Sequence, residues 1–184
     1  MIIIKDNYYL YIENLEDLDF KTLKSNRKIN IIYRNIKKFN IFKTLRFRNK
    51  CKIKKFKFFI ANDYNKAKMT KADGIYISSY NKKRYYSNIL KIGSAHSLKE
   101  INEKVKQRCK NIIVSRLFKT NYKNKTSFLG VLKFNLLCLK TKQKIIPLGG
   151  INENNLLKLN LVKSNGFAIL SAVKKKPTIS SRLF

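Results

Sequence analysis

The chain has little of several residue types: one histidine, two prolines, three cysteines and 10 Asp and Glu in 184 residues. Cys51, Cys109 and Cys138 are odd in number and far apart, without a CxxC pair, which predicts reduced, packed thiols. No apolar run approaches the ~18 residues that a membrane span needs. Residues 1–6 show no secretion signal, because no charged segment with a long apolar core begins there. We therefore expect a soluble, cytoplasmic protein with no membrane partner.

Acidic residues are scarce beside 42 Lys and Arg, and the net charge is +32. Such a charge ordinarily predicts nucleic-acid binding. Asn and Ile are abundant as well, however, and AT-rich codons account for Lys, Asn and Ile together. The densest basic run, 43–57, has apolar residues at roughly helical spacing, which is typical of a solvated helix face. A basic RNA-binding protein is a distant alternative, and an attraction for phosphorylated small molecules follows under either interpretation.

Short β-type runs alternate with helical segments along one domain-sized chain. Strands are expected at 8–12, 29–33, 56–61, 74–78, 90–92, 112–114, 145–148 and 166–173. Helical segments are expected at 15–24, 36–55, 64–71, 97–105, 129–139 and after 152, with at most one turn in 81–88. This alternation predicts an α/β fold, a (β/α)8 TIM barrel in a short version. Because such barrels usually need at least ~200 residues, the barrel is either pared down or incomplete. We expect the barrel in residues 1–173 and a basic tail in 174–184.

The segment 144–154 carries the clearest signal of a site. A buried strand is followed by Gly149 and Gly150, and Asn152 stands where a helix cap belongs. Exposed backbone N–H groups and the missing Cβ atoms would admit a phosphate, although a plain strand-to-helix turn has the same pattern. The next strand ends near Ser171 and favours the phosphate, because the loops after the last two strands of such barrels hold one.

Polar side chains follow the expected strands at their carboxyl ends, the face on which such barrels carry out chemistry. They are Arg34, Asn62, Asp63, Ser78, Ser94, His96, Ser115 and Ser171. The pattern leaves His96 open between an acid/base group and a satisfied surface residue. It also leaves Asp63 open between a ligand of a divalent ion and the cap of the next helix.

An ordered set of segments resembles the thiamine phosphate synthase family and its TenI (thiazole tautomerase) branch. The segments are 33–34, 60–63, 72–75, 92–97, 118–123, 149–152 and 170–172, and the resemblance runs from about residue 8 to residue 173. It implies a TIM barrel that acts in thiamine biosynthesis. A synthase joins a pyrimidine diphosphate to a thiazole phosphate and expels pyrophosphate with the help of Mg²⁺, whereas the TenI branch isomerises the thiazole.

The resemblance also implies roles for individual residues. Those that would hold the thiazole phosphate are Gly149, Gly150, Leu170 and Ser171. Those that would contact the pyrimidine diphosphate are Arg34, Asn62 and Lys123, with Lys123 also offsetting charge on the leaving group. In catalysis, Asp63 would bind Mg²⁺, Ser94 would lie near the reacting centre, and His96 would be the acid/base group of a tautomerase.

The chain departs from the family pattern in two places. The motif Gln-x-Arg-x-Lys is replaced by Ile32-Tyr-Arg-Asn-Ile36, which loses two side chains that would grip the diphosphate, although Lys37 is adjacent. The motif Gly-Gln-x-Asp is replaced by residues 78–81, Ser-Ser-Tyr-Asn, which weakens the Mg²⁺ site because its second acid is missing. A synthase, a tautomerase and a non-catalytic thiazole-phosphate binding or regulatory barrel all stay open, as does a homo-oligomer.

Overall fold

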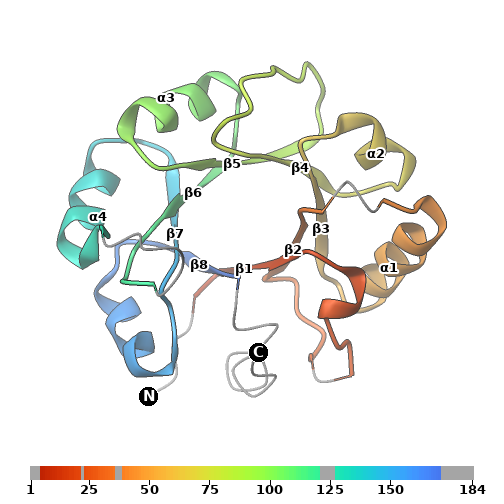
Figure 1. The fold of residues 1–184 in the computed structure, drawn as a ribbon, viewed down its shortest axis with the longest axis horizontal. Coiled ribbons are helices and arrows are strands. Elements are labelled where there is room, and N and C mark those ends of the chain that lie inside the picture. The colour runs from red at the N-terminus through yellow and green to blue at the C-terminus, as the bar shows by residue number, and fades with distance from the viewer. Residues whose placement is uncertain (1–4, 22, 36–38, 121–126, 171–184) are drawn as a thin grey trace.

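Eight parallel strands close into a barrel in which each strand pairs with the next and β8 pairs with β1 (Figure 1). The computed structural model describes residues 5–21, 23–35, 39–120 and 127–170. The strands are β1 (Asn7–Ile12), β2 (Ile29–Tyr33), β3 (Lys57–Ala61), β4 (Gly74–Ile77), β5 (Leu90–Ala95), β6 (Asn111–Ser115), β7 (Lys144–Leu148) and β8 (Gly166–Ile169). The predicted (β/α)8 barrel is confirmed, and the predicted tail 174–184 lies outside the described residues.

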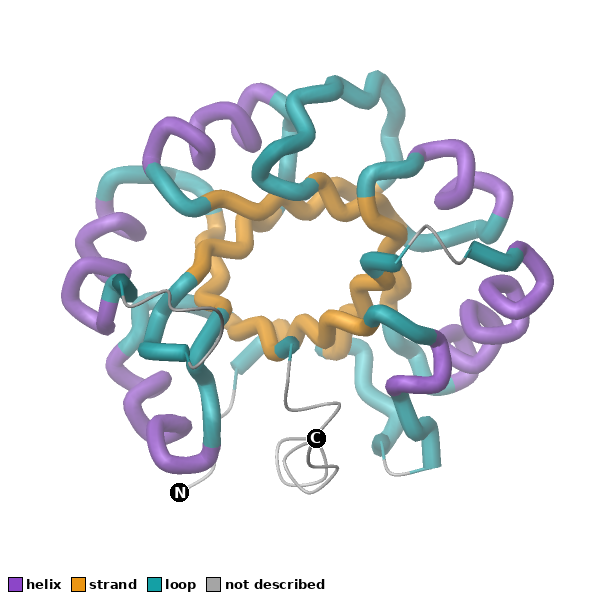
Figure 2. The backbone as a smooth tube through the Cα atoms, in the orientation of Figure 1, coloured by secondary structure: helices purple, strands orange, loops and turns teal. Residues whose placement is uncertain are grey.

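The helices lie outside the ring of strands (Figure 2). They are α1 (Ile41–Ile53), α2 (Tyr64–Met69), α3 (Leu98–Lys106), α4 (Gly130–Leu139) and the 3-10 helices η1 (Leu15–Asp17) and η3 (Glu153–Leu161). The β4–β5 connection contains no helix, as expected from its sequence. None of the helices in the described part of the chain is both long enough and apolar enough to span a membrane.

Two predicted helices are shorter in the structure. In the described residues of the segment 15–24, the helical structure is limited to the 3-10 turn η1, because the Asp17 carboxylate accepts hydrogen bonds from the backbone N–H groups of Glu13 and Asn14 and closes the chain locally. The helix expected at 36–55 begins at Ile41, where the Asn40 side chain accepts from the Lys43 N–H at 3.0 Å as an N-cap. Local capping side chains therefore shorten both elements.

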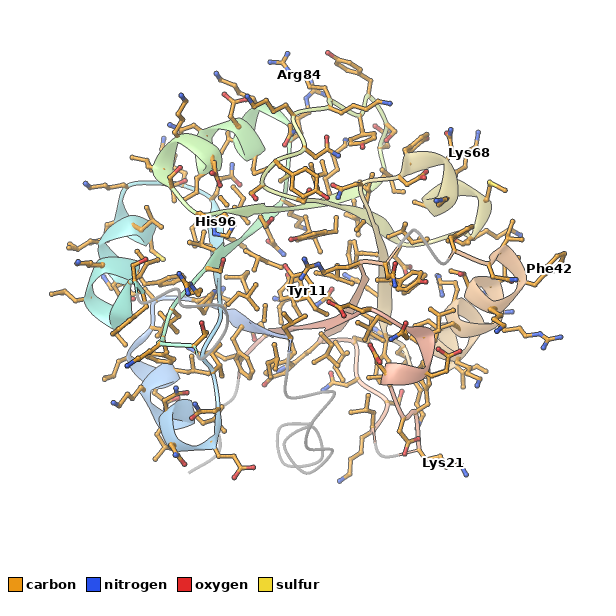
Figure 3. The ribbon with its side chains drawn as sticks, viewed as in Figure 1. Tyr11, Lys21, Phe42, Lys68, Arg84 and His96 are labelled. Atoms are coloured by element: carbon orange, nitrogen blue, oxygen red, sulfur yellow. The ribbon has the colours of Figure 1, made fainter. Side chains whose placement is uncertain are left out.

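Large side chains fill the barrel interior. Tyr9 and Tyr11 point inward from β1, and Tyr11 meets Tyr76 edge to face with ring centroids 5.4 Å apart. Figure 3 shows Tyr11 at the centre of the ring. The Tyr9 hydroxyl accepts a hydrogen bond from the Asn111 amide at 2.6 Å, and burial raises the pKa of Tyr9 to about 12. The interior is therefore a packed core, and ligand-sized space lies at its carboxyl-end mouth.

Candidate active site

A cavity of about 510 Å³ opens at the carboxyl ends of β6, β7 and β8. Its wall includes Gly149 and Gly150 after β7, and it extends to Leu170 after β8. The basic residues Arg116 and Lys119, after β6, line the same wall. We call this space the larger cavity. It lies where the sequence predicted a phosphate, and it is large enough for a small phosphorylated ligand.

Both glycines of the β7 turn have backbone conformations that other residues rarely adopt. The φ angles are 99° at Gly149 and 70° at Gly150. A Cβ atom on Gly150 would lie 2.5 Å from the carbonyl oxygens of Phe118 and Lys119, so the turn fits directly against the loop after β6. The Phe118 N–H donates to the Gly149 carbonyl at 3.0 Å and closes this contact. Glycine is therefore required at position 150 both by φ and by space.

Asparagines fix the start of η3 beside this turn. The Asn152 side chain accepts from the Asn154 N–H at 3.0 Å, as its predicted capping position requires. Asn155, which the sequence did not single out, accepts from the Asn152 N–H at 2.9 Å and donates to the Gly150 carbonyl at 2.7 Å. The predicted helix is a 3-10 helix. These bonds hold the turn in its shape.

A second cavity of about 240 Å³, the smaller cavity, lies at the ends of β2, β3 and β4. Its lining includes Glu13, Asn62 and Tyr80. Arg34 lines both cavities, and its guanidinium carbon lies 5.5 Å from the Tyr11 ring centroid. This cation–π contact holds the predicted substrate-binding arginine at the boundary between the two spaces.

Asn62 is the centre of a hydrogen-bond network in the smaller cavity. Its Oδ1 accepts from the Ser78 N–H at 2.9 Å, the Ser78 hydroxyl at 3.0 Å and the Asn81 amide at 3.0 Å. Its own amide donates to the Tyr80 hydroxyl at 3.1 Å. A carboxylate at position 81 would direct an acceptor at the Asn62 oxygen. The local structure thus fits the replacement of the family's acid by asparagine, because the Asn81 amide donates a hydrogen bond that a carboxylate could not donate.

A buried lysine holds the loop that carries this network. Lys104, 1% exposed, donates from Nζ to the carbonyl oxygens of Ser78 at 2.7 Å and Asn81 at 2.8 Å, and to Gln107 Oε1 at 2.9 Å. Burial lowers the pKa of Lys104, an effect opposed by nearby Cys109 and by acidic groups on α3. A Cβ atom on Gly93 would lie 2.8 Å from Lys104 Cγ, so this glycine makes room for the lysine stem. Sequence reasoning missed Lys104, although it lies three residues after the core residue Ile101.

The candidate metal ligand Asp63 serves as a helix cap. One carboxylate oxygen accepts from the Lys66 N–H at 2.9 Å, and the other lies 3.4 Å from Lys66 Nζ. Within the described ranges, no cluster of three or more His, Cys, Asp or Glu side chains could hold a metal ion. These residues therefore do not provide a ready-made Mg²⁺ site, and the assignment of Mg²⁺ to Asp63 stays a prediction.

His96 directly follows β5 (Figure 3). Its Nδ1 is 2.9 Å from the Ser115 hydroxyl and 3.2 Å from the Ser115 carbonyl oxygen. Ser115 lines the larger cavity, so it connects the histidine to the cavity wall. The backbone N–H of His96 donates to the Glu100 carboxylate at 2.8 Å. The imidazole of His96 thus contacts a residue of the cavity wall, and its catalytic role stays a prediction.

The other predicted site residues divide into two groups. Ser94 is buried in β5, and Leu170 lines the larger cavity. Lys123 and Ser171, like Lys37, lie outside the described residues. Sequence reasoning missed Arg116 and Lys119 as cavity residues. In a chain so rich in basic residues they carry no signal until the fold places them beside the glycine turn.

Closed parallel strands with ligand-sized cavities at their carboxyl ends place the chain among the (β/α)8 barrel proteins. Residues 40–173 match the family described as thiamine monophosphate synthase, and the chain belongs to this family. The resemblance to thiamine phosphate synthases is therefore confirmed.

One relative is similar to part of this chain in sequence, and several solved structures share its fold. A thiamine-phosphate synthase of Prochlorococcus marinus is 35% identical over 80 residues, which are 44% of this chain and only 23% of that protein. The thiamine phosphate pyrophosphorylase of Pyrococcus furiosus superposes with a TM-score of 0.76 at 18% identity, over 97% of this chain and 93% of the other. The Bacteroides thetaiotaomicron pyrophosphorylase gives 0.61 at 16% identity, over 90% and 83%. A 3-keto-L-gulonate-6-phosphate decarboxylase from Vibrio cholerae gives 0.62 at 12%, over 96% and 95%, so the barrel itself is widely shared.

Proposed function

We propose that the protein is a thiamine phosphate synthase that takes two phosphorylated small molecules from the cytoplasm. The observation that carries the proposal is the pair of adjacent cavities that share Arg34. A reaction that joins two substrates needs two binding spaces meeting at one point, whereas an isomerase needs one. The membership of the chain in the synthase family supports the same choice.

In the proposed arrangement, the thiazole phosphate occupies the larger cavity, with its phosphate at the Gly149–Gly150 turn. The pyrimidine occupies the smaller cavity against Asn62 and Tyr80. The thiazole nitrogen forms a bond to the pyrimidine methylene carbon, the carbon–oxygen bond breaks, and pyrophosphate leaves with the electron pair. Arg34, placed between the cavities, offsets negative charge as it develops on the leaving oxygen.

A second candidate function is thiazole tautomerisation of the TenI type. The contact between His96 Nδ1 and the Ser115 hydroxyl favours it, because this histidine could pass a proton to the cavity wall. A binding or regulatory barrel without catalysis would use the larger cavity alone. These alternatives differ in which residues they need.

Chromatographic detection of thiamine phosphate tests the proposal. The full chain is incubated with the pyrimidine diphosphate and thiazole phosphate, with and without Mg²⁺, beside Arg34→Gln and His96→Asn. A synthase predicts product from the native chain, loss of about a hundredfold or more in Arg34→Gln, and a small change in His96→Asn. Product formation that requires His96 but tolerates Arg34→Gln would contradict the mechanism, and no product at all would contradict the synthase.

A further inference from the structure

We propose that Arg34, the retained arginine of the strand-two motif, forms a three-cation site for the diphosphate with Arg116 and Lys119, which compensate for the two replaced motif side chains. The identity of the anion rests on the proposed function. The three side chains line the larger cavity from opposite sides, Arg34 from the end of β2 and the other two from the loop after β6. Neither Arg116 nor Lys119 was predicted to bind a substrate.

Of the two replaced motif side chains, the one at position 32 lies among the described residues, and it cannot contact the anion. Ile32 is fully buried and packs in the barrel interior with Tyr9, Tyr11 and Phe59. This position now supplies apolar packing, and its side chain offers no donor to the cavity. A diphosphate held at the mouth therefore needs charge from another wall of the barrel.

The loop after β6 supplies that charge and is held in place by the glycine turn. A Cβ atom on Gly149 would lie 3.0 Å from Arg116 Cγ, so the arginine stem lies directly over this glycine. Arg116 Nη1 also donates to the Thr120 hydroxyl at 3.4 Å. The carbonyl oxygen of Lys119 fits against Gly150. The turn that would hold one phosphate thus also fixes the side-chain stem of Arg116 and the backbone of Lys119.

The charges around the two cavities differ. Among the described residues that line the larger cavity there is no acid, whereas the smaller cavity has Glu13 beside Arg34. A multiply charged anion is attracted by several cations acting together, and a guanidinium can bind two phosphate oxygens at once. The larger cavity is therefore the favourable place for the diphosphate, beside the thiazole phosphate, with the ester oxygen of the diphosphate toward Arg34 and the smaller cavity.

Calorimetric titration with inorganic pyrophosphate tests the site without relying on turnover. The full chain is titrated in EDTA and again in Mg²⁺, together with Arg116→Gln, Lys119→Gln and Arg116→Lys. Matched controls are Arg108→Gln and Lys110→Gln, which remove the same charges from exposed positions that precede β6, at the opposite end of the barrel. Melting temperatures show that each variant is folded.

We expect the native chain to bind pyrophosphate in EDTA. Arg116→Gln and Lys119→Gln should each weaken binding about tenfold to a hundredfold, the controls less than about threefold, and Arg116→Lys should recover part of the loss. Equal affinities in all variants, or native binding that requires Mg²⁺, would overturn the three-cation site even if thiamine phosphate is formed. Arg116-dependent pyrophosphate binding without product formation would leave the site standing and overturn the proposed synthase.

Discussion

The two cavities at the barrel mouth are built in different ways. The larger one is built from backbone, with two glycines whose φ angles are positive and whose missing Cβ atoms let the β7 turn meet the β6 loop. The smaller one is built from side chains, and Ser78, Tyr80 and Asn81 each hydrogen-bond to Asn62. Backbone geometry leaves few alternatives to glycine, whereas a side-chain network can be replaced as a unit. The family pattern is accordingly kept at the first cavity and altered at the second.

The difference separates two kinds of binding. A turn of backbone N–H groups can bind the phosphate of many different esters, because its hydrogen bonds go to the phosphate oxygens alone. An amide and phenol network suits the edge of a heterocycle, because its donors and acceptors have fixed directions. We therefore assign affinity for phosphate to the larger cavity and selectivity for the heterocyclic ring to the smaller one.

The largest expected effect comes from Gly150→Ala. The new methyl group would overlap the carbonyl oxygens of Phe118 and Lys119, in a backbone conformation unfavourable to alanine. We expect thiazole-phosphate affinity, measured by calorimetry, to fall at least about a hundredfold as the turn and loop separate. Gly130→Ala is the matched control, since its φ is similarly positive at 68° and nothing lies within 4 Å of the added Cβ. It should cost only about 1 kcal/mol of stability and leave binding unchanged; a loss of binding there would contradict the steric account.

Lys104→Met should damage the smaller cavity selectively. The ammonium group satisfies buried carbonyl oxygens of Ser78 and Asn81, and losing it leaves them without this donor, at a cost of about 2–4 kcal/mol in unfolding free energy. Pyrimidine binding should weaken, whereas thiazole-phosphate binding should persist. Exposed Lys106, paired with Glu103 at 3.5 Å, provides the control Lys106→Met, expected within about 0.5 kcal/mol of the native chain.

The pH dependence of Lys104→Met sharpens this test. Burial lowers the pKa of Lys104 below 10.5, so the native fold disfavours the charged ammonium group. This destabilisation of the native state disappears as the pH rises from the lowered pKa of the folded protein to 10.5. Urea unfolding at increasing pH should show the native chain gaining stability relative to Lys104→Met over that interval. A difference between the two proteins that is constant with pH would contradict burial of the charge.

Asn81→Asp tests whether restoring the family's acid at this position also restores Mg²⁺-dependent binding. The aspartate would face the Asn62 oxygen, which now accepts from the Asn81 amide at 3.0 Å, so we expect a loss of about 1–3 kcal/mol in stability. Pyrimidine affinity, measured by calorimetry, should fall several-fold with or without Mg²⁺. A Mg²⁺-dependent gain in affinity would show instead that the altered cavity has kept its metal-binding capacity.

The smallest effect concerns the core beneath both cavities. Folding raises the pKa of Tyr9 to about 12 from an ordinary value of 10, so its stabilising contribution is present below pH 10 and is lost between pH 10 and about 12. Tyr9→Phe removes this dependence. We expect the stability difference between the native chain and Tyr9→Phe to change only above pH 10 in urea unfolding, and ligand affinity at neutral pH to change little. A change centred near pH 8 would contradict the buried position of this phenol.

Much of the fold follows from sequence pattern. The apolar runs at 8–12, 29–33 and 145–148 are strands, and Ser97 caps α3 as expected. Helix limits were harder to predict, because Asn40 and Asp17 cap elements that hydrophobic spacing alone extends further.

The part of the site that the sequence predicted best is the glycine turn, where the backbone conformation limits the choice of residue. Gly149 and Gly150 stand out in a chain with six glycines. Arg116 and Lys119 do not stand out among 42 basic residues, and Lys104 looks like a solvated helix residue until burial is known. The contacts that give these residues a role join segments far apart in sequence, so composition and spacing could not show them.

The central claim is that the glycine-turn cavity recognises a phosphate ester and that the smaller cavity does not. Calorimetry with the thiazole phosphate and with the same thiazole lacking its phosphate tests it most directly. The account predicts at least about hundredfold tighter binding of the phosphate ester, a preference lost in Gly150→Ala and kept in Asn81→Asp. Equal affinity for the two compounds, or a preference that survives Gly150→Ala and disappears in Asn81→Asp, would contradict it.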